Sequence, residues 1–214
     1  MPASRASLSL QLSLYRRQKA RISRSVIGSS PVFRRYEARY RRATRSYTRV
    51  TTLTDVKKAV CAADVVYVGD YHTLKLAQLG YLDLVREAVQ SHRRVVLALE
   101  LVEGRHQGTL DDFLLGKLTE AEFLEAIGHP YRGAFDIWPN FAPVLELARE
   151  KGLMVLAIDK RSRSKSSLEE RDRFAAQQLA AVARADDRPL VLVLMGQFHI
   201  TPAHLPSRTK EALG

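Results

Sequence analysis

Several short apolar runs in this 214-residue sequence end in residues that could hold a ligand or transfer a proton. The runs "VVYVGDYH" and "VLVLMGQFH" both close on Gly, a polar residue, an aromatic residue and His, while "VVLALE" and "LMVLAID" close on an acid. Carboxylates and imidazoles in one place can bind a metal ion or perform acid–base chemistry. The residues at these ends are Asp70, Tyr71, His72, Glu100, Asp159 and His199.

These residues would meet if the runs are parallel strands, because ligands of open parallel sheets bind outside the carboxyl ends of the strands. The glycines at 69 and 196 would allow a sharp turn or the close approach of a ligand to the backbone. Each residue also has a plainer interpretation. The histidines could be turn or cap residues and Asp70 could cap the next helix. Glu100, however, follows a buried run and needs a partner.

The spacing of apolar residues predicts strands that alternate with helices. We predict strands at Val65–Val68, Val95–Leu99, Met154–Ile158 and Leu190–Leu194, each a nearly unbroken apolar run. Such runs are typical of a parallel sheet covered by helices on both faces, so the predicted fold class is α/β. Expected helix ends are a cap at Thr54, a capping box at Thr119 and Glu122, and a C-terminal glycine at 152.

Two segments depart from this alternation. The stretch "QGTLDDFLLGKLTEAEFLEAIG" predicts a pair of short helices, which we assign to a helical insert at about 104–137 within an α/β domain at 51–214. Residues 1–50 hold 13 of the 34 Lys and Arg residues but one of the 23 acids. They are predicted to form a basic extension of two helices broken at "GSSP", although "SLSLQLSLY" alternates as a strand would.

Composition restricts the function and the location. A single cysteine, Cys61, allows neither an internal disulfide nor a cysteine-based metal cluster, and it is expected to be a core residue. No secretory or lipoprotein signal and no membrane-spanning run is visible, so the expected location is the cytoplasm by default. The basic extension could bind nucleic acid or anionic membrane. No glycine-rich phosphate loop, GxSxG or HExxH motif occurs.

Four blocks between Thr54 and Pro206 resemble, in the same order, the ChaN family of haem-binding uptake proteins, relatives of Tiki proteases and erythromycin esterases. The blocks are "VVYVGDYH", "LALELVEGRHQGTLDDFLLGKLTEAEFL", "WPNFAPVLELAREKGLMVLAID" and "VLVLMGQFHI". The resemblance implies a large α/β domain with a small helical subdomain and a role linked to haem or iron. Its site positions correspond here to Asp70, His72, Glu100, Gln107 and His199.

The sequence also departs from the family pattern. The family's Glu is Asp70 here, its usual Asp after the first His is Thr73, and a further His is replaced by Ala77. These changes count more against a metal-dependent hydrolase than against a binding protein. Haem iron can be held by Tyr, His or Met. Tyr71 and Tyr81 are therefore the candidate phenolates, with His106, His129 and His204 as further candidates and with Phe113, Phe123 and Trp138 as cover for a flat ligand.

Three hypotheses follow. In the first, the chain is a ChaN-type protein that binds haem or a small iron-bearing ligand at the strand ends, as a monomer or a homodimer, in iron or haem uptake or handling. In the second, His72, Glu100 and His199 hold a divalent metal for a hydrolase. In the third, the basic extension is the functional part and the α/β domain is its scaffold.

Overall fold

Four parallel strands form the sheet of this protein, as predicted. The structure is a computed structural model, and it describes residues 9–10, 13–14, 16–17, 31–45, 51–71, 74–129, 136–160 and 167–214. The strands are β1 (Val65–Asp70), β2 (Val95–Glu103), β3 (Met154–Asp159) and β4 (Leu190–Gly196). Their order across the sheet is β1-β4-β2-β3, and every pairing is parallel. The last strand in the chain therefore lies between the first two.

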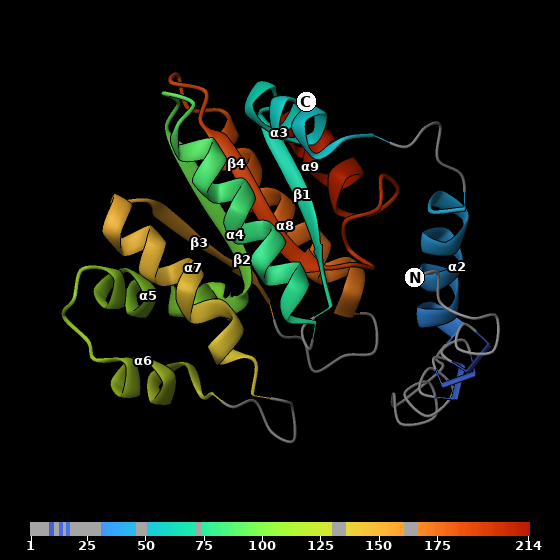
Figure 1. Cartoon of the computed structure of the whole chain (residues 1–214), viewed down its shortest axis with the longest axis horizontal. Coiled ribbons are helices and arrows are strands. Elements are labelled where there is room, and N and C mark those ends of the chain that lie inside the picture. The colour runs from blue at the N-terminus through green and yellow to red at the C-terminus, as the bar shows by residue number, and fades with distance from the viewer. Residues whose placement is uncertain are drawn as a thin grey trace, which may run out of the picture.

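Helices cover both faces of this sheet (Figure 1). One face packs on α4 (Lys75–Val89), α5 (Gln107–Leu114) and α7 (Trp138–Lys151), and the other on α8 (Ser167–Ala183) and α9 (Leu205–Leu213). Alternate residues of each strand enter the two cores, so Leu192 belongs to the first core and Val193 to the second. This alternation is the two-residue period of a strand buried on both sides.

The short helices begin and end where local chemistry favours it. The helix α6 (Glu120–Ile127) has the predicted capping box, since Thr119 and Glu122 bond reciprocally to each other's backbone. Gly152 ends α7 in the left-handed conformation, with a φ of 61°. The helix α3 (Leu53–Ala62) is capped by Thr52 and not by the predicted Thr54, because the Thr52 hydroxyl accepts from the Asp55 amide at 3.1 Å.

The strand β2 is longer than predicted. It continues to Glu103 instead of ending at Glu100, and its register against β3 shifts between Leu99 and Glu103. A bulge of this kind redirects side chains locally. A 3-10 turn, η1 (Gly104–His106), follows, and Gly104 is required there because an added Cβ would lie 2.3 Å from the Phe174 ring.

The basic extension contains one well-defined helix, α2 (Pro31–Ala43), as predicted for its second half. The described residues between 9 and 17 are helical too, so the expectation of a strand there is wrong for those residues. Among the described residues, each helix is too short or too polar to cross a membrane. In Figure 1, α2 lies at the side of the domain where β4 leads into α9.

Candidate functional site

The carboxyl ends of β1 and β4 lie side by side at one edge of the sheet. Asp70 is the register partner of Gly196, and the Gln197 amide donates to the Asp70 carbonyl at 3.1 Å. The Asp70 side chain is buried and accepts a hydrogen bond from the Gln78 amide in α4. Since β2 is the other neighbour of β4, the end of the sheet gathers residues from all three strands.

Glu100 reaches across to β4 from the irregular part of β2. One of its carboxylate oxygens accepts a hydrogen bond from the Gly196 amide, and the other accepts one from Arg171 of α8. A Cβ at position 196 would lie 3.2 Å from Glu100 Oε2, the oxygen that accepts from the Gly196 amide, and 3.6 Å from the His199 ring. The missing side chain at Gly196 therefore leaves room for the Glu100 carboxylate. Glu100 and His199 both lie beside this glycine.

Arg171 joins two buried carboxylates. Its Nε donates to Asp159 at 2.7 Å while its terminal nitrogen donates to Glu100, and both acids have side chains 8% exposed. Burial raises the pKa of Asp159 above its ordinary value, although Arg171 opposes this rise. Burial also disfavours the charged guanidinium, but Glu100 and Asp159 outweigh it and raise the pKa of Arg171. The three groups form a charged bridge between β2, β3 and α8.

His199 is held by a second set of groups. Its Nδ1 lies 2.5 Å from Asp172 Oδ1 of α8 and 3.0 Å from the Tyr36 hydroxyl of α2. The Tyr36 hydroxyl donates to the other Asp172 oxygen at 2.8 Å. Because a carboxylate accepts and does not donate, the hydrogen bond to Asp172 requires a proton on His199 Nδ1. Asp172 thereby sets the tautomer of His199, as an acid does for a catalytic or ligating histidine.

Tyr36 closes this part of the site. Only 1% of it is exposed, and its ring stacks on His204 with centroids 3.7 Å apart. Burial raises the pKa of Tyr36 well above its ordinary value, and Asp172 adds to the rise, so the phenol stays protonated. His204 donates from Nδ1 to the Phe198 carbonyl at 2.6 Å, and burial lowers its pKa. The basic extension thus contributes directly to the strand-end cluster.

The two candidate phenolates lie in different surroundings. Tyr71 follows β1 and is 53% exposed, whereas Tyr81 is fully buried in the core. The Tyr81 hydroxyl donates to the Leu192 carbonyl at 2.7 Å, and burial raises its pKa well above 10.0. Of the two tyrosines, Tyr71 is therefore the one that solvent or a ligand can reach. His72, which the sequence placed next to it, lies outside the described residues.

Gln107 has a structural role in this geometry. Its side-chain nitrogen donates to the Val155 carbonyl at 2.8 Å, and its oxygen accepts from the Ala157 amide at 2.8 Å. The amide thereby pairs with β3, the strand at the edge of the sheet, as another strand would. The Gln107 side chain contacts the middle of β3, at Val155 and Ala157, and not its end at Asp159. These contacts therefore do not bring Gln107 together with Glu100 and His199.

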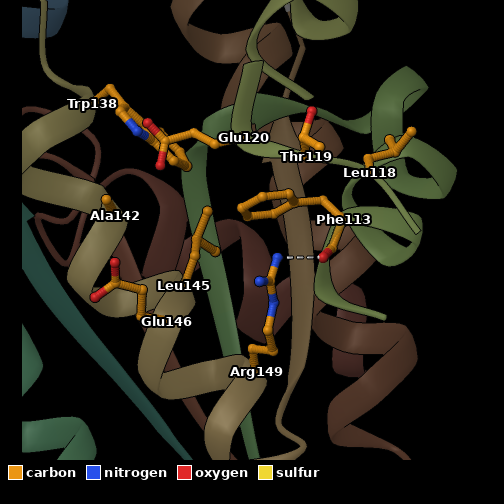
Figure 2. Close-up of a pocket in the computed structure, with 9 residues that line it drawn as sticks. All are labelled: Phe113, Leu118, Thr119, Glu120, Trp138, Ala142, Leu145, Glu146 and Arg149. Atoms are coloured by element: carbon orange, nitrogen blue, oxygen red, sulfur yellow. Dashed lines mark hydrogen bonds between the residues drawn. The ribbon is translucent and has the colours of Figure 1, made fainter. Parts of the chain in front are cut away.

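The aromatic residues of the insert pack on one another. The Phe113 and Phe123 rings stack with centroids 4.4 Å apart, and Trp138 contacts both. Figure 2 shows the hollow beside them, where Arg149 lies 4.5 Å from the Phe113 ring and donates to the Phe113 carbonyl at 2.6 Å. Its volume is about 130 Å³, whereas ligand pockets usually hold roughly 300–1,000 Å³. These rings belong to the buried core on the face of the sheet that α4 and α7 cover.

The remaining candidates lie elsewhere. His129 bonds through Nε2 to Asp136 at 3.0 Å, and His106 precedes α5 without a side-chain cap bond. Within the described ranges, no group of three or more His, Cys, Asp or Glu residues is arranged to hold a metal ion.

Sequence reasoning missed three important members of the site: Tyr36, Arg171 and Asp172. A signal for Asp172 was present, since the buried face of α8 runs through Ala175, Ala176 and Leu179, and a residue one turn earlier continues that face. An acid on an apolar helical face needs a partner, which is the reason to look for His199. The corresponding signal in α2 is the i, i+3, i+7 spacing of Phe33, Tyr36 and Tyr40.

Comparison with known proteins adds two findings. The family model described as "Haem-binding uptake, Tiki superfamily, ChaN" matches residues 56–171. The chain is also similar to the structure described as "Cofacial heme binding to ChaN of Campylobacter jejuni", with 12% identity and a TM-score of 0.56 over 76% of this chain and 82% of that chain. At this identity the structural likeness shows the fold alone. No curated protein matches the chain.

Proposed function

The chain belongs to the ChaN family of haem-binding uptake proteins in the Tiki superfamily, and we propose that it binds haem at the carboxyl edge of its sheet. Its cellular role would then be the uptake or handling of haem or iron. The observation that carries this proposal is the position of Tyr71. It stands 53% exposed directly after β1, beside a buried cluster of carboxylates and histidine.

Tyr71 is the proposed iron ligand. Phenolate oxygen is one of the axial ligands that proteins supply to haem iron. A ligand of this kind must be reachable by a large flat cofactor, and the exposed Tyr71 satisfies this requirement. Tyr81 does not, because its hydroxyl is bonded to the Leu192 carbonyl inside the core.

The start of α4 supplies the apolar surface that a porphyrin needs. Leu74, Leu76 and Leu79 are 47%, 71% and 39% exposed, and they follow Tyr71 within eight residues. Large exposed leucines grouped on one element often mark a binding surface. A haem held by Tyr71 would cover part of this leucine surface. Asp70, Glu100, His72 and His199 would act as nearby polar groups that tune affinity.

Titration of the purified apoprotein with hemin tests the proposal. We expect a Soret band that saturates, with a charge-transfer band from a phenolate ligand, and we expect Tyr71→Phe to shift or remove both. Tyr81→Phe is the matched control, since it removes an equivalent hydroxyl from the core and should leave the hemin spectrum unchanged. An unaltered spectrum in Tyr71→Phe, or a spectrum lost only in Tyr81→Phe, would contradict the assignment.

We also propose that haem bound at this surface brings two copies of the chain together. A flat haem resting on Leu74, Leu76 and Leu79 would leave its other face in water, and a second copy of the chain could cover it. Sedimentation velocity with and without hemin should show a shift from monomer to dimer that is weakened by Leu76→Gln. A monomer at saturating hemin would limit the proposal to a single-chain site.

The metal-dependent hydrolase is less well supported. Glu100 already accepts hydrogen bonds from Arg171 and the Gly196 amide, and His199 is bonded to Asp172, so both candidate ligands have charged or polar protein partners. Elemental analysis of the purified protein separates the two functions. Stoichiometric zinc or manganese that is lost in His199→Ala, together with no saturable hemin spectrum, would favour the hydrolase.

A further inference from the structure

The helix α2 touches the α/β domain through aromatic side chains on one face. Phe33 and Tyr40 meet the Phe198 ring edge-on, with centroids 5.9 and 4.9 Å apart, and the Tyr40 hydroxyl donates to Gln197 at 3.0 Å. Between them, Tyr36 enters the space above His204 and is buried. Aromatic rings and hydrogen bonds therefore hold this face of α2 on the domain.

The opposite side of α2 is strongly basic. Glu37 is the one acid within the helix, where it pairs with Arg41 at 2.6 Å, and Arg39 pairs with Glu169 of α8 at 3.2 Å. The helix itself carries five arginines and this single acid. We call this surface the arginine face of α2; its exposed members are Arg34, Arg35, Arg41 and Arg42, together with Arg45 two residues after the helix.

A helix with aromatic residues on one side and arginines on the other has the composition of helices that lie in the interface of an anionic bilayer. The arginines meet lipid phosphates, and tyrosine and phenylalanine enter the boundary with the acyl chains, where tyrosine keeps its hydroxyl in water. The aromatic side of α2 is the side that now contacts the domain. The helix therefore cannot contact lipid and the domain through this side at the same time.

We propose that α2 binds an anionic lipid surface, and that it leaves the α/β domain when it does so. Release of Tyr36 uncovers Asp172, His199 and His204, the two histidines being 3% and 2% exposed while α2 is docked. A nucleic acid would need only the arginine face, so it would leave Tyr36 in place and the histidines covered. The aromatic composition of the docked side favours lipid over nucleic acid as the partner.

Vesicle sedimentation tests the binding step with the full chain. We expect binding to vesicles of phosphatidylglycerol and phosphatidylcholine and none to phosphatidylcholine alone. Each arginine near an anionic surface strengthens binding about fivefold, so the triple variant Arg35→Gln, Arg42→Gln, Arg45→Gln should bind about a hundredfold more weakly. The control Lys58→Gln, Arg86→Gln, Lys117→Gln removes equal charge from exposed positions of the domain and should bind nearly as the unaltered chain does.

Modification of histidine by diethylpyrocarbonate, located by mass spectrometry, tests the release step without haem. Without lipid, His199 and His204 should react slowly and the exposed His92 quickly. Anionic vesicles should speed the reaction of the first two several-fold and leave His92 unchanged. Vesicle binding with His199 and His204 still protected would overturn the release of α2. Binding to single-stranded RNA with no vesicle binding would overturn lipid as the partner. Equal loss of binding in both triple variants would overturn the assignment to the arginine face.

Discussion

Replacing Arg171 with methionine removes the guanidinium that bridges Glu100 and Asp159 while keeping most of the packing volume. Two charge-assisted hydrogen bonds disappear, one to each acid, and both carboxylates remain in place with 8% of their side chains exposed. Glu100 would still accept from the Gly196 amide and Asp159 from the Lys160 amide. Neither amide supplies a full positive charge.

The size of the effect follows from this burial. Breaking a buried ion pair by removal of one partner costs about 3–5 kcal/mol, because a buried charge loses its counter-charge. For a protein of this length, that loss lowers Tm by about 6–20 °C. Arg171 is itself 20% exposed on its side chain, so water reaches the site only in part.

The loss of stability in Arg171→Met should depend on pH. Asp159 already has a raised pKa from burial, and removal of Arg171 takes away the main influence that lowers it. Its folded pKa therefore lies further above that of the unfolded chain, and the folded state keeps protons that the unfolded state has lost. Stability of the variant then falls as pH rises through the folded pKa. The deficit against the unaltered protein should be largest at pH 7 and shrink toward pH 4.

Thermal and urea unfolding at several pH values measure this deficit. Arg173→Met is the matched control, since Arg173 is an exposed residue of the same helix and its replacement should change stability by less than about 0.5 kcal/mol. A loss below about 1 kcal/mol in Arg171→Met at pH 7, or a loss of equal size at pH 7 and pH 4.5, would show that the bridge does not behave as a buried charged pair.

Three further outcomes are expected. Tyr81→Phe should cost about 1–3 kcal/mol in urea unfolding, because the buried Leu192 carbonyl loses its donor. Gly196→Ala should lower Tm, since the new methyl group crowds the Glu100 carboxylate at 3.2 Å, whereas Gly80→Ala, with open space around it on a helix, should raise Tm slightly. Deletion of residues 1–50 should leave one cooperative unfolding transition, because the four strands of the described sheet lie after residue 51. A broad transition without a midpoint would place α2 in the folding core.

The residues that the sequence analysis singled out at the strand ends lie at one edge of the sheet, together with side chains that it did not name. The four strands were predicted from their apolar runs, and a parallel sheet must bring their carboxyl ends to one edge, so Asp70, Glu100 and His199 converge there as inferred. The glycine at 196 was predicted to permit a close approach to the backbone. The group that approaches is the Glu100 carboxylate, a partner that the pattern of the strand did not reveal.

The sequence alone determined the features that depend on neighbours along the chain. Strand and helix periodicity, the capping box at Thr119 and Glu122, and the terminal glycine at 152 all arise from contacts within a few residues, so a local pattern suffices to predict them. The basic charge of residues 1–50 is local in the same sense.

The tertiary structure decided which side chains meet. Tyr36 lies 136 positions from Asp172 and 163 from His199 in the chain, and no local pattern encodes such a pairing. The same holds for Tyr71 and Tyr81, two similar phenols ten residues apart. Tyr71 is exposed after β1, while Tyr81 lies on the buried side of α4 and donates a hydrogen bond to the Leu192 carbonyl of β4. Long-range packing of helices on the sheet sets these positions, and with them the chemistry that each residue can perform.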